Sequence, residues 1–375
     1  MTVPEFEIDL TYLVDCLMDL VRTPSPTGYT QNAVALAERA FAALGVEAER
    51  TNKGALVAIL PGRSSGRPRA LSGHVDTLGA MVKEIKEDGR LKLTNVGGYM
   101  WQTVEGEYCA VETAGGQVYT GTVLAHKTAV HTYGREGLAE SKHTADDVEV
   151  RLDERTTSAV QTRGLGIEVG DFVSFDPRTT VTESGYVKSR HLDDKAGVAV
   201  MMAAAKALVD GNMQPAQDSY LYISPYEEVG HGAASGIPTA VKELLVVDMG
   251  ALGDGQNSDE YTVSICAKDS SGPYDLGMRR RLVSLCRAHE IAYRVDIYPS
   301  YGSDGSAALR AGAPAGRGHA DPVGAGDGLR RRLVRAFLAL RTGRSAADRA
   351  TLVRRVTLDL TGLPPTPMRW IFASP

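Results

Sequence analysis

ALVAILPGRSSGRPRALSGHVD, residues 55–76, contains two short apolar runs separated by a loop rich in glycine, proline and serine. Runs of this length, bounded by turn-forming residues, are typical of buried strands. Upstream of them, residues 8–22 and 31–44 carry apolar residues at helical spacing. Helices followed by short buried strands predict an α/β fold with a mainly parallel sheet flanked by helices.

The pattern changes after the second predicted strand. From residue 80 to 186, short alternating segments such as RLKLTNV and VEVRLDE are separated by glycines and charged turns, which is typical of a small all-β module. Helix and strand patterns return with HLDDKAGVAVMMAAAKALVD and continue to a helix near 275–290. We therefore predict one α/β domain formed by residues 1–79 and 187–311, with an inserted β-domain at residues 80–186.

The composition is that of a globular protein large enough for two domains. The chain has 375 residues, of which 43% are apolar and 23% charged. A net charge of −5, without a basic stripe over most of the length, argues against a nucleic-acid partner. No run approaches the roughly 18 apolar residues of a membrane-spanning helix, and the acidic N-terminus does not resemble a signal peptide. Four cysteines without metal or redox spacing indicate reduced thiols, so we expect a cytoplasmic protein with no membrane partner.

His74 and Asp76 stand at the end of the second predicted strand, in SGHVDTLG (72–79). Side chains at the carboxyl ends of parallel strands face a common crevice, and imidazole is a frequent zinc ligand. Asp76 can accept the other N–H of the imidazole and fix the tautomer that binds metal. A lone histidine after a strand is more often a core or surface residue, so its meaning depends on the carboxylates that join it.

Four further carboxylates follow predicted strands or open a helix. Asp193, in HLDDKAGVAV, can cap the helix that follows or can bridge two metal ions. Glu227 and Glu228 directly follow the apolar strand LYISPY, which a solvated surface explains poorly. One can bind metal while the other, its pKa raised by burial beside a carboxylate, takes a proton from water. Asp248 follows LLVV, where an unpaired carboxylate is costly to bury. The set predicts a two-metal hydrolytic site.

At these motifs the chain resembles the glutamyl and deblocking aminopeptidases that build tetrahedral (TET) particles, family forty-two of the metallopeptidases. The resemblance extends from about residue 5 to residue 312 and is carried by TPSPTGYT (23–30), SGHVDTLG (72–79), GYVKSRHLDDKAGVAV (185–200), PYEEVGHGAASGIP (225–238), VVDMG (246–250) and YGSDGSAALRAG (301–312). It implies a zinc-exopeptidase-like catalytic domain of the α/β class with an inserted small all-β dimerisation domain. It also implies a homodimer or a higher homo-oligomer.

The resemblance implies the chemistry as well. Such enzymes hydrolyse the N-terminal residue from peptide substrates with two divalent ions per subunit, zinc or cobalt. The implied metal ligands are His74, Asp193, Glu228 and Asp248. Asp193 would be shared by both ions, Glu227 would be the general base toward a water bridging them, and Asp76 would support His74.

Two matters stay open at the level of sequence. Lys268, in AKDSSGPYD (267–275), follows a strand near the expected cleft and could attract an acidic first residue of a peptide; a surface lysine is an equally good interpretation. The second function that we weigh belongs to another class. It is a non-catalytic paralogue that dimerises through the β-insert and serves as a binding or assembly subunit.

Residues 312–375 form an atypical tail. The last 66 residues of the chain contain twelve arginines, no lysine and four aspartates, which gives a charge of +8 against −13 for the rest. Family members carry a further histidine after the motif matched by Ser303–Asp304, and it completes the second metal site. The window VGAGDGLRRRLVRAFL (323–338) has none, and His319 lies in a glycine-rich linker. We therefore infer a frame shift or chimeric join that impairs the second site; resequencing the coding DNA across this stretch tests the inference.

Overall fold

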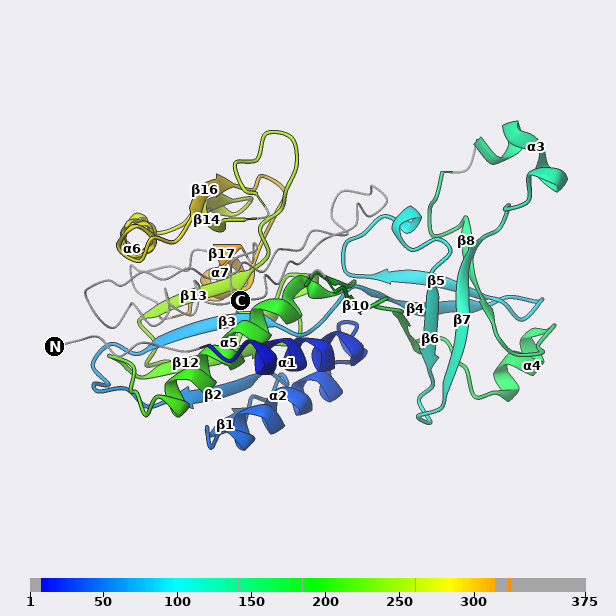
Figure 1. Ribbon diagram of the computed structural model, residues 1–375. Coiled ribbons are helices and arrows are strands. Elements are labelled where there is room, and N and C mark those ends of the chain that lie inside the picture. The colour runs from blue at the N-terminus through cyan, green and yellow to red at the C-terminus, as the bar shows by residue number, and fades with distance from the viewer. Residues whose placement is uncertain (1–7, 140–141, 184, 260, 314–322, 325–375) are drawn as a thin grey trace.

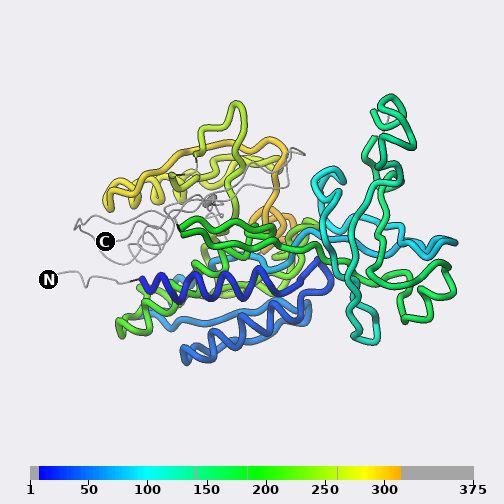
Figure 2. Tube along the Cα trace, turned by 45° about the vertical axis from the view of Figure 1, so that its right-hand side comes forward, coloured from blue at the N-terminus to red at the C-terminus, as the bar shows by residue number. Residues whose placement is uncertain are grey.

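The computed structural model describes residues 8–139, 142–183, 185–259, 261–313 and 323–324. Figure 1 shows a layered α/β body from which a β-barrel projects at one end, and the tube in Figure 2 shows the same two parts from another side. The predicted tail from residue 312 falls almost entirely outside the described residues. No helix in the described part of the chain has both the length and the hydropathy to cross a bilayer.

A mixed sheet forms the centre of the α/β body. Its strands lie in the order β1-β2-β12-β3-β13-β17-β14-β15, and β16 pairs with β14. The central strands β12, β3 and β13 are parallel, whereas β1, β2 and β15 join through antiparallel pairs. The centre of the sheet is thus parallel, as predicted, whereas strands nearer its edges join through antiparallel pairs. The strands are β1 (Ala48–Arg50), β2 (Leu56–Leu60), β3 (Arg69–His74), β12 (Ser219–Ser224), β13 (Glu243–Asp248), β14 (Val263–Asp269), β15 (Gly272–Pro273), β16 (Tyr293–Ile297) and β17 (Val323–Gly324).

Helices cover both faces of this sheet. The residues of β12 alternate between the faces: Leu221 and Ile223 pack with the larger helical layer, and Tyr222 packs with the opposite one. The larger layer contains α1 (Leu10–Arg22), α2 (Gln31–Ala43), α5 (Leu192–Asp210) and α6 (Leu276–Ala288). The opposite face holds α7 (Asp304–Arg310) and the 3₁₀ turn η3 (Gly232–Ala234). Helix α5 is apolar almost all round because it lies between α1 and the sheet.

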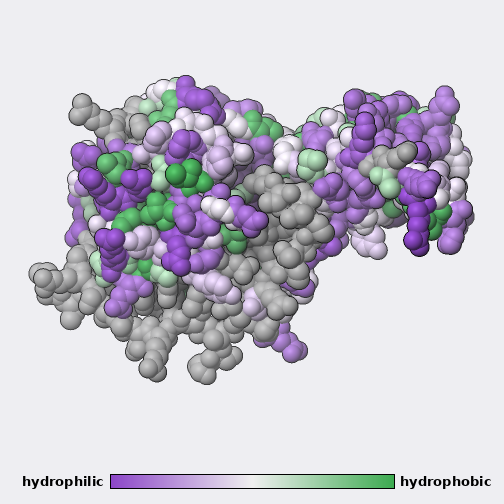
Figure 3. All heavy atoms as spheres, turned by 90° about the horizontal axis from the view of Figure 1, so that it is seen from above, coloured by the Kyte–Doolittle hydropathy of each residue, from purple (hydrophilic) through white to green (hydrophobic). Residues whose placement is uncertain are grey.

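The projecting part is a closed barrel with strand order β4-β5-β8-β7-β6-β9. It has its own apolar core, which includes Val82, Leu93, Val111 and Val173. Its strands are β4 (Gly79–Ile85), β5 (Leu91–Val96), β6 (Tyr108–Glu112), β7 (Val118–Ala125), β8 (Val148–Leu152) and β9 (Phe172–Phe175). The hairpin of β10 (Thr180–Val181) and β11 (Val187–Lys188) leads back to α5. Seen from above, the barrel forms a separate lobe with a mostly hydrophilic surface (Figure 3).

The barrel module is not purely β. It also contains α3 (Val130–Ala139), α4 (Ala159–Gly164) and the 3₁₀ turn η1 (Trp101–Thr103). Helix α3 buries none of its residues and is interrupted at Gly134, whose φ of 71° is not helical, so the segment gives no sustained helical pattern. The expectation of an all-β module is corrected in this respect.

Candidate metal centre

The predicted site residues meet at one edge of the sheet. His74 is the last residue of β3 and Asp248 the last of β13. Glu227 and Glu228 open the 3₁₀ turn η2 (Glu227–Val229), just beyond the end of β12. Because β12, β3 and β13 are parallel, their carboxyl ends lie together. Asp193, at the start of α5, reaches the same place.

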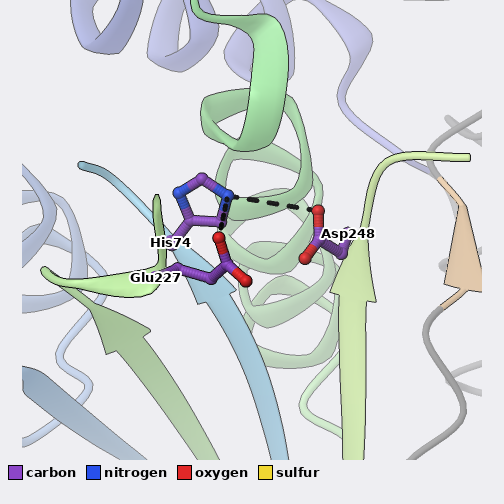
Figure 4. A group of neighbouring side chains, drawn as sticks. All are labelled: His74, Glu227 and Asp248. Carbon is purple, nitrogen blue, oxygen red and sulfur yellow. Dashed lines mark ion pairs between the residues drawn. The ribbon is translucent and has the colours of Figure 1, made fainter. Parts of the chain in front are cut away.

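The imidazole of His74 is the centre of this cluster and is almost fully buried. Its Nε2 atom lies 3.1 Å from Oδ1 of Asp193, 3.8 Å from Oε2 of Glu227 and 4.0 Å from Oδ1 of Asp248. Figure 4 shows the side chains of Glu227, from the turn after β12, and of Asp248, from the end of β13, converging on His74 between them. Ligand atoms of these three residues lie within 4.8 Å of one another, a spacing that could hold a metal ion.

Asp76 organises the acidic turn behind this cluster. Its Oδ1 accepts the amide N–H of Glu227 at 3.0 Å, and its Oδ2 accepts that of Glu228 at 3.1 Å. The hydroxyl of Thr27 donates to the same Oδ2 at 2.7 Å. Nδ1 of His74 is 2.9 Å from the backbone carbonyl of Asp76 and 3.5 Å from its carboxylate. Asp76 thus supports His74 mainly through its carbonyl, because the carboxylate serves the two glutamate amides.

The cluster brings several carboxyl groups together in a buried place, and this changes their pKa values. Burial, with neighbouring carboxylates, raises the pKa of Glu227 and of Glu228 well above the ordinary value, although His74 opposes the shift. Burial and the charge of Asp193 raise the pKa of Asp248 to about 7. Burial alone would lower the pKa of His74, but hydrogen bonds to Asp193 and Asp76 raise it well above 6.5.

This donor set fits divalent metal ions. Imidazole and carboxylate oxygens are the ligands that zinc uses at catalytic sites, where three protein ligands are usual. A cation here would offset the repulsion among the carboxylates of the cluster, which helps to raise the pKa of Glu227, Glu228 and Asp248. The residues present therefore suit the group that the motifs imply.

Three residues at this edge were not among the predicted site residues. Oδ2 of Asp194 accepts the amide of His74 at 3.1 Å, and burial raises the pKa of this carboxyl. Asp304 is buried and accepts the hydroxyl of Ser72 at 3.0 Å and the amide of Ala233 at 2.8 Å. Tyr301 comes from the loop before α7. The run SDGSAAL repeats the pattern of aspartate before a small-residue helix seen in DDKAGVAV, which is the signal that could have found Asp304.

The structure places Lys268 on β14 and describes little of the predicted tail. Lys268 lies on β14, and its ammonium donates to the carbonyl of Asp269 at 2.8 Å. His319 and all but two residues of the window 323–338 lie outside the described residues. The two that are described form β17, in which Gly324 is the register partner of Asp248.

The sequence is similar to known peptidases over most of its length. The family model for M42 glutamyl aminopeptidases matches residues 54–317. A protein of Bacillus subtilis (strain 168), the candidate aminopeptidase YhfE, is 50% identical over 299 residues, which cover 80% of this chain and 86% of that protein.

Solved structures share the fold. The aminopeptidase APDkam598 from the archaeon Desulfurococcus kamchatkensis gives a TM-score of 0.76 at 19% identity, covering 88% of this chain and 94% of its own. The Pyrococcus horikoshii TET1 peptidase, which can assemble into a tetrahedron or a large octahedral shell, gives 0.71 at 21% identity, covering 84% and 91%. The fold of this chain is therefore that of the TET aminopeptidases. Together with the match of the family model, these findings show that the chain belongs to the M42 glutamyl aminopeptidase family, whose members are hydrolases.

Proposed function

We propose that this chain is a metal-dependent aminopeptidase that removes N-terminal residues from peptides at the edge formed by β3, β12 and β13. The observation that carries the proposal is the convergence of ligand atoms from His74, Glu227 and Asp248 within 4.8 Å. A buried cluster of one imidazole and several carboxylates has no use in packing, because unpaired charges are costly to bury.

The metal ligands in this proposal are His74, Asp193, Glu228 and Asp248, for two divalent ions, zinc or cobalt. Bound cations of this kind polarise a scissile carbonyl and lower the pKa of water. Asp76 fixes the backbone of Glu227 and Glu228 through their amides, and we assign the two adjacent carboxylates different roles.

Glu227 is the general base in this proposal. Burial raises its pKa well above the ordinary value of a glutamate, and a base works best when its pKa lies near the working pH. In its unprotonated form Glu227 takes a proton from water and then gives it to the departing amine. The geometry also admits the reverse assignment, in which Glu227 binds metal and Glu228 is the base, because Glu227 belongs to the trio around His74.

A pair of matched variants separates these roles. Glu227→Gln removes basicity but keeps shape, so we expect kcat to fall by about 10²–10⁴-fold while metal content, measured by elemental mass spectrometry, stays at the wild-type level. Glu228→Gln should lower metal content. The opposite result for the two variants would exchange their roles, and unchanged kcat in both would refute the mechanism.

A non-catalytic paralogue is the second candidate. It is favoured by the fact that His74 is the one histidine that the described residues contribute to the cluster. Metal content per subunit after equilibration with zinc and desalting distinguishes the two. About two ions per chain, with peptide cleavage, supports the enzyme, whereas one ion or none without cleavage supports the paralogue.

We further propose that residues 80–186 serve as a dimerisation domain, inserted between catalytic parts 1–79 and 187–311 and followed by the tail 312–375. The barrel surface supports this role because it exposes large apolar residues, among them Tyr108 and Val118. We place the protein in the cytoplasm because its four cysteines are free thiols.

A further inference from the structure

We infer that the hydroxyl of Tyr301 is a catalytic hydrogen-bond donor, which stabilises the oxygen that becomes negative when water attacks the scissile carbonyl. The inference rests on the proposed function and adds a residue to it. Tyr301 lies in the loop between β16 and α7, and this loop meets the edge of the sheet where His74 and Asp248 end their strands.

The first observation is that this hydroxyl is buried but not engaged in a regular hydrogen bond. Its oxygen is enclosed, and within the described residues it completes no hydrogen bond of normal geometry. Buried polar groups in native proteins are nearly always hydrogen-bonded, so an exception calls for an explanation. A donor kept free for a substrate atom is such an explanation.

The second observation is the place of the phenol, beside the proposed metal centre. Burial and the charges of Asp248, Glu227 and Asp193 together raise the pKa of Tyr301. The hydroxyl also approaches Asp248 as a hydrogen-bond donor, short of normal bond geometry, and so lowers the pKa of that carboxyl. The three carboxylates that act on this phenol are members of the proposed metal centre. A substrate carbonyl bound at that centre therefore comes within reach of the O–H group.

The third observation is that the loop is held in place on both sides. The backbone carbonyl of Tyr301 accepts a hydrogen bond from the amide of Ser270 at 3.0 Å and another from the hydroxyl of Ser270 at 2.7 Å. The ring packs against that of Tyr298, with centroids 5.4 Å apart. Beyond the loop, Asp304 is bound to the amide of Ala233. A donor that is already oriented stabilises developing charge without reorganisation.

The proposed hydrolysis has two steps, attack by water and loss of the amine. The water oxygen forms a bond to the carbonyl carbon, the π electrons move to the carbonyl oxygen, and Glu227 takes the water proton. The hydroxyl of Tyr301 donates a hydrogen bond to the new oxyanion without losing its proton. The oxyanion electrons then restore the double bond, the C–N bond breaks, and the nitrogen leaves with the proton held by Glu227.

The test compares Tyr301→Phe with the matched control Tyr298→Phe. The control also removes a buried tyrosine hydroxyl, but this one is bonded to Ser258 at 2.8 Å. For Tyr301→Phe we expect kcat on a chromogenic aminoacyl amide to fall by about 10²-fold, with little change in KM and wild-type metal content. Affinity for a phosphonate dipeptide analogue, whose tetrahedral phosphorus mimics the intermediate, should fall by a similar factor. The control should keep the wild-type kcat and analogue affinity.

Other results would overturn the inference. Wild-type kcat and analogue affinity in Tyr301→Phe would show that the hydroxyl has no part in catalysis. A loss of metal from this variant, with analogue affinity falling only in proportion, would make Tyr301 a support for Asp248 instead. If the wild-type chain with full metal content cleaves no peptide and does not bind the analogue, the proposed function fails, and this inference fails with it.

Discussion

Asp248 and His74 both hold protons more tightly than usual, because several buried carboxylates surround a single imidazole. The pKa of Asp248 is raised to about 7, chiefly by burial, and that of His74 is raised by its bonds to Asp193 and Asp76 in spite of burial. Without metal, each group holds a proton in the folded chain at a pH where the unfolded chain has released it. By linkage, both contributions to stability are present at low pH and are lost as the pH rises.

We therefore predict that the metal-free protein is less stable at pH 7.5 than at pH 5.5, with a Tm lower by a few degrees. His191 and Lys195 act in the opposite sense, since burial lowers the pKa of His191 to about 3 and that of Lys195 to about 7, but they are two groups against several raised carboxyls. Saturation with zinc should reverse the order, because metal and protons compete for the same atoms. Calorimetry in a chelator and in zinc measures both, and a metal-free Tm that rises with pH would contradict the prediction.

Lys268 is the residue on which substrate preference is tested. We propose that its ammonium attracts an acidic first residue, although in the structure it donates to the carbonyl of Asp269. Lys268→Met should abolish any preference for Glu- and Asp-peptides, as measured by kcat/KM on Glu-, Asp- and Leu-aminoacyl amides. Lys242→Met, at another site, serves as the control. Unchanged selectivity in Lys268→Met would remove this residue from the pocket.

At the scale of elements, the start of α5 depends on a glycine. A Cβ built on Gly197 would lie 2.7 Å from Oδ2 of Asp194 and closer still to its Oδ1. That carboxylate holds the amide of His74 at 3.1 Å. The small-residue helix seen in the sequence thus has a specific cause at this position, namely room for a buried carboxylate beside the proposed metal ligands.

Gly197→Ala should therefore destabilise the fold by about 1–3 kcal/mol, as overpacking does, and should also lower metal content. Gly164→Ala is the matched control, because a Cβ there meets nothing within 4 Å; it should be neutral or stabilising by up to about 1 kcal/mol. Urea unfolding and elemental analysis test the pair. Equal stability of the two variants would show that Asp194 moves aside at little cost.

The sequence predicted those elements whose signals are local. Periodicity located α1, α2 and α5, and the parallel arrangement of β3, β12 and β13 explains why residues far apart in sequence meet at one edge. The periodicity of the sequence could not predict that β12 pairs antiparallel with β2, because strand order depends on contacts between distant segments. For the same reason the bond between Ser72 and Asp304, which are 232 residues apart, left no trace in either local pattern.

At the scale of the molecule, we predict that the protein is a dimer or a larger assembly formed through the barrel. Multi-angle light scattering should give a mass of at least two chains. The double variant Tyr108→Ser, Val118→Ser should shift the mass toward one chain, because both side chains are more than half exposed apolar groups on the barrel. Leu276→Ser, an exposed apolar site on α6, is the control. A monomeric wild-type protein would refute the prediction.

Both chain connections between the barrel and the body run beside the proposed metal centre. One connection, residues 75–78, leaves directly from His74 and is pinned by a bridge between Pro26 and Thr77. The other, residues 189–192, ends at Asp193. The barrel also touches the body at Tyr29, which donates a hydrogen bond to Glu112 on β6 and packs against Phe172 on β9. A contact that another subunit makes with the barrel would therefore act on segments that end at His74 and Asp193, two of the proposed metal ligands.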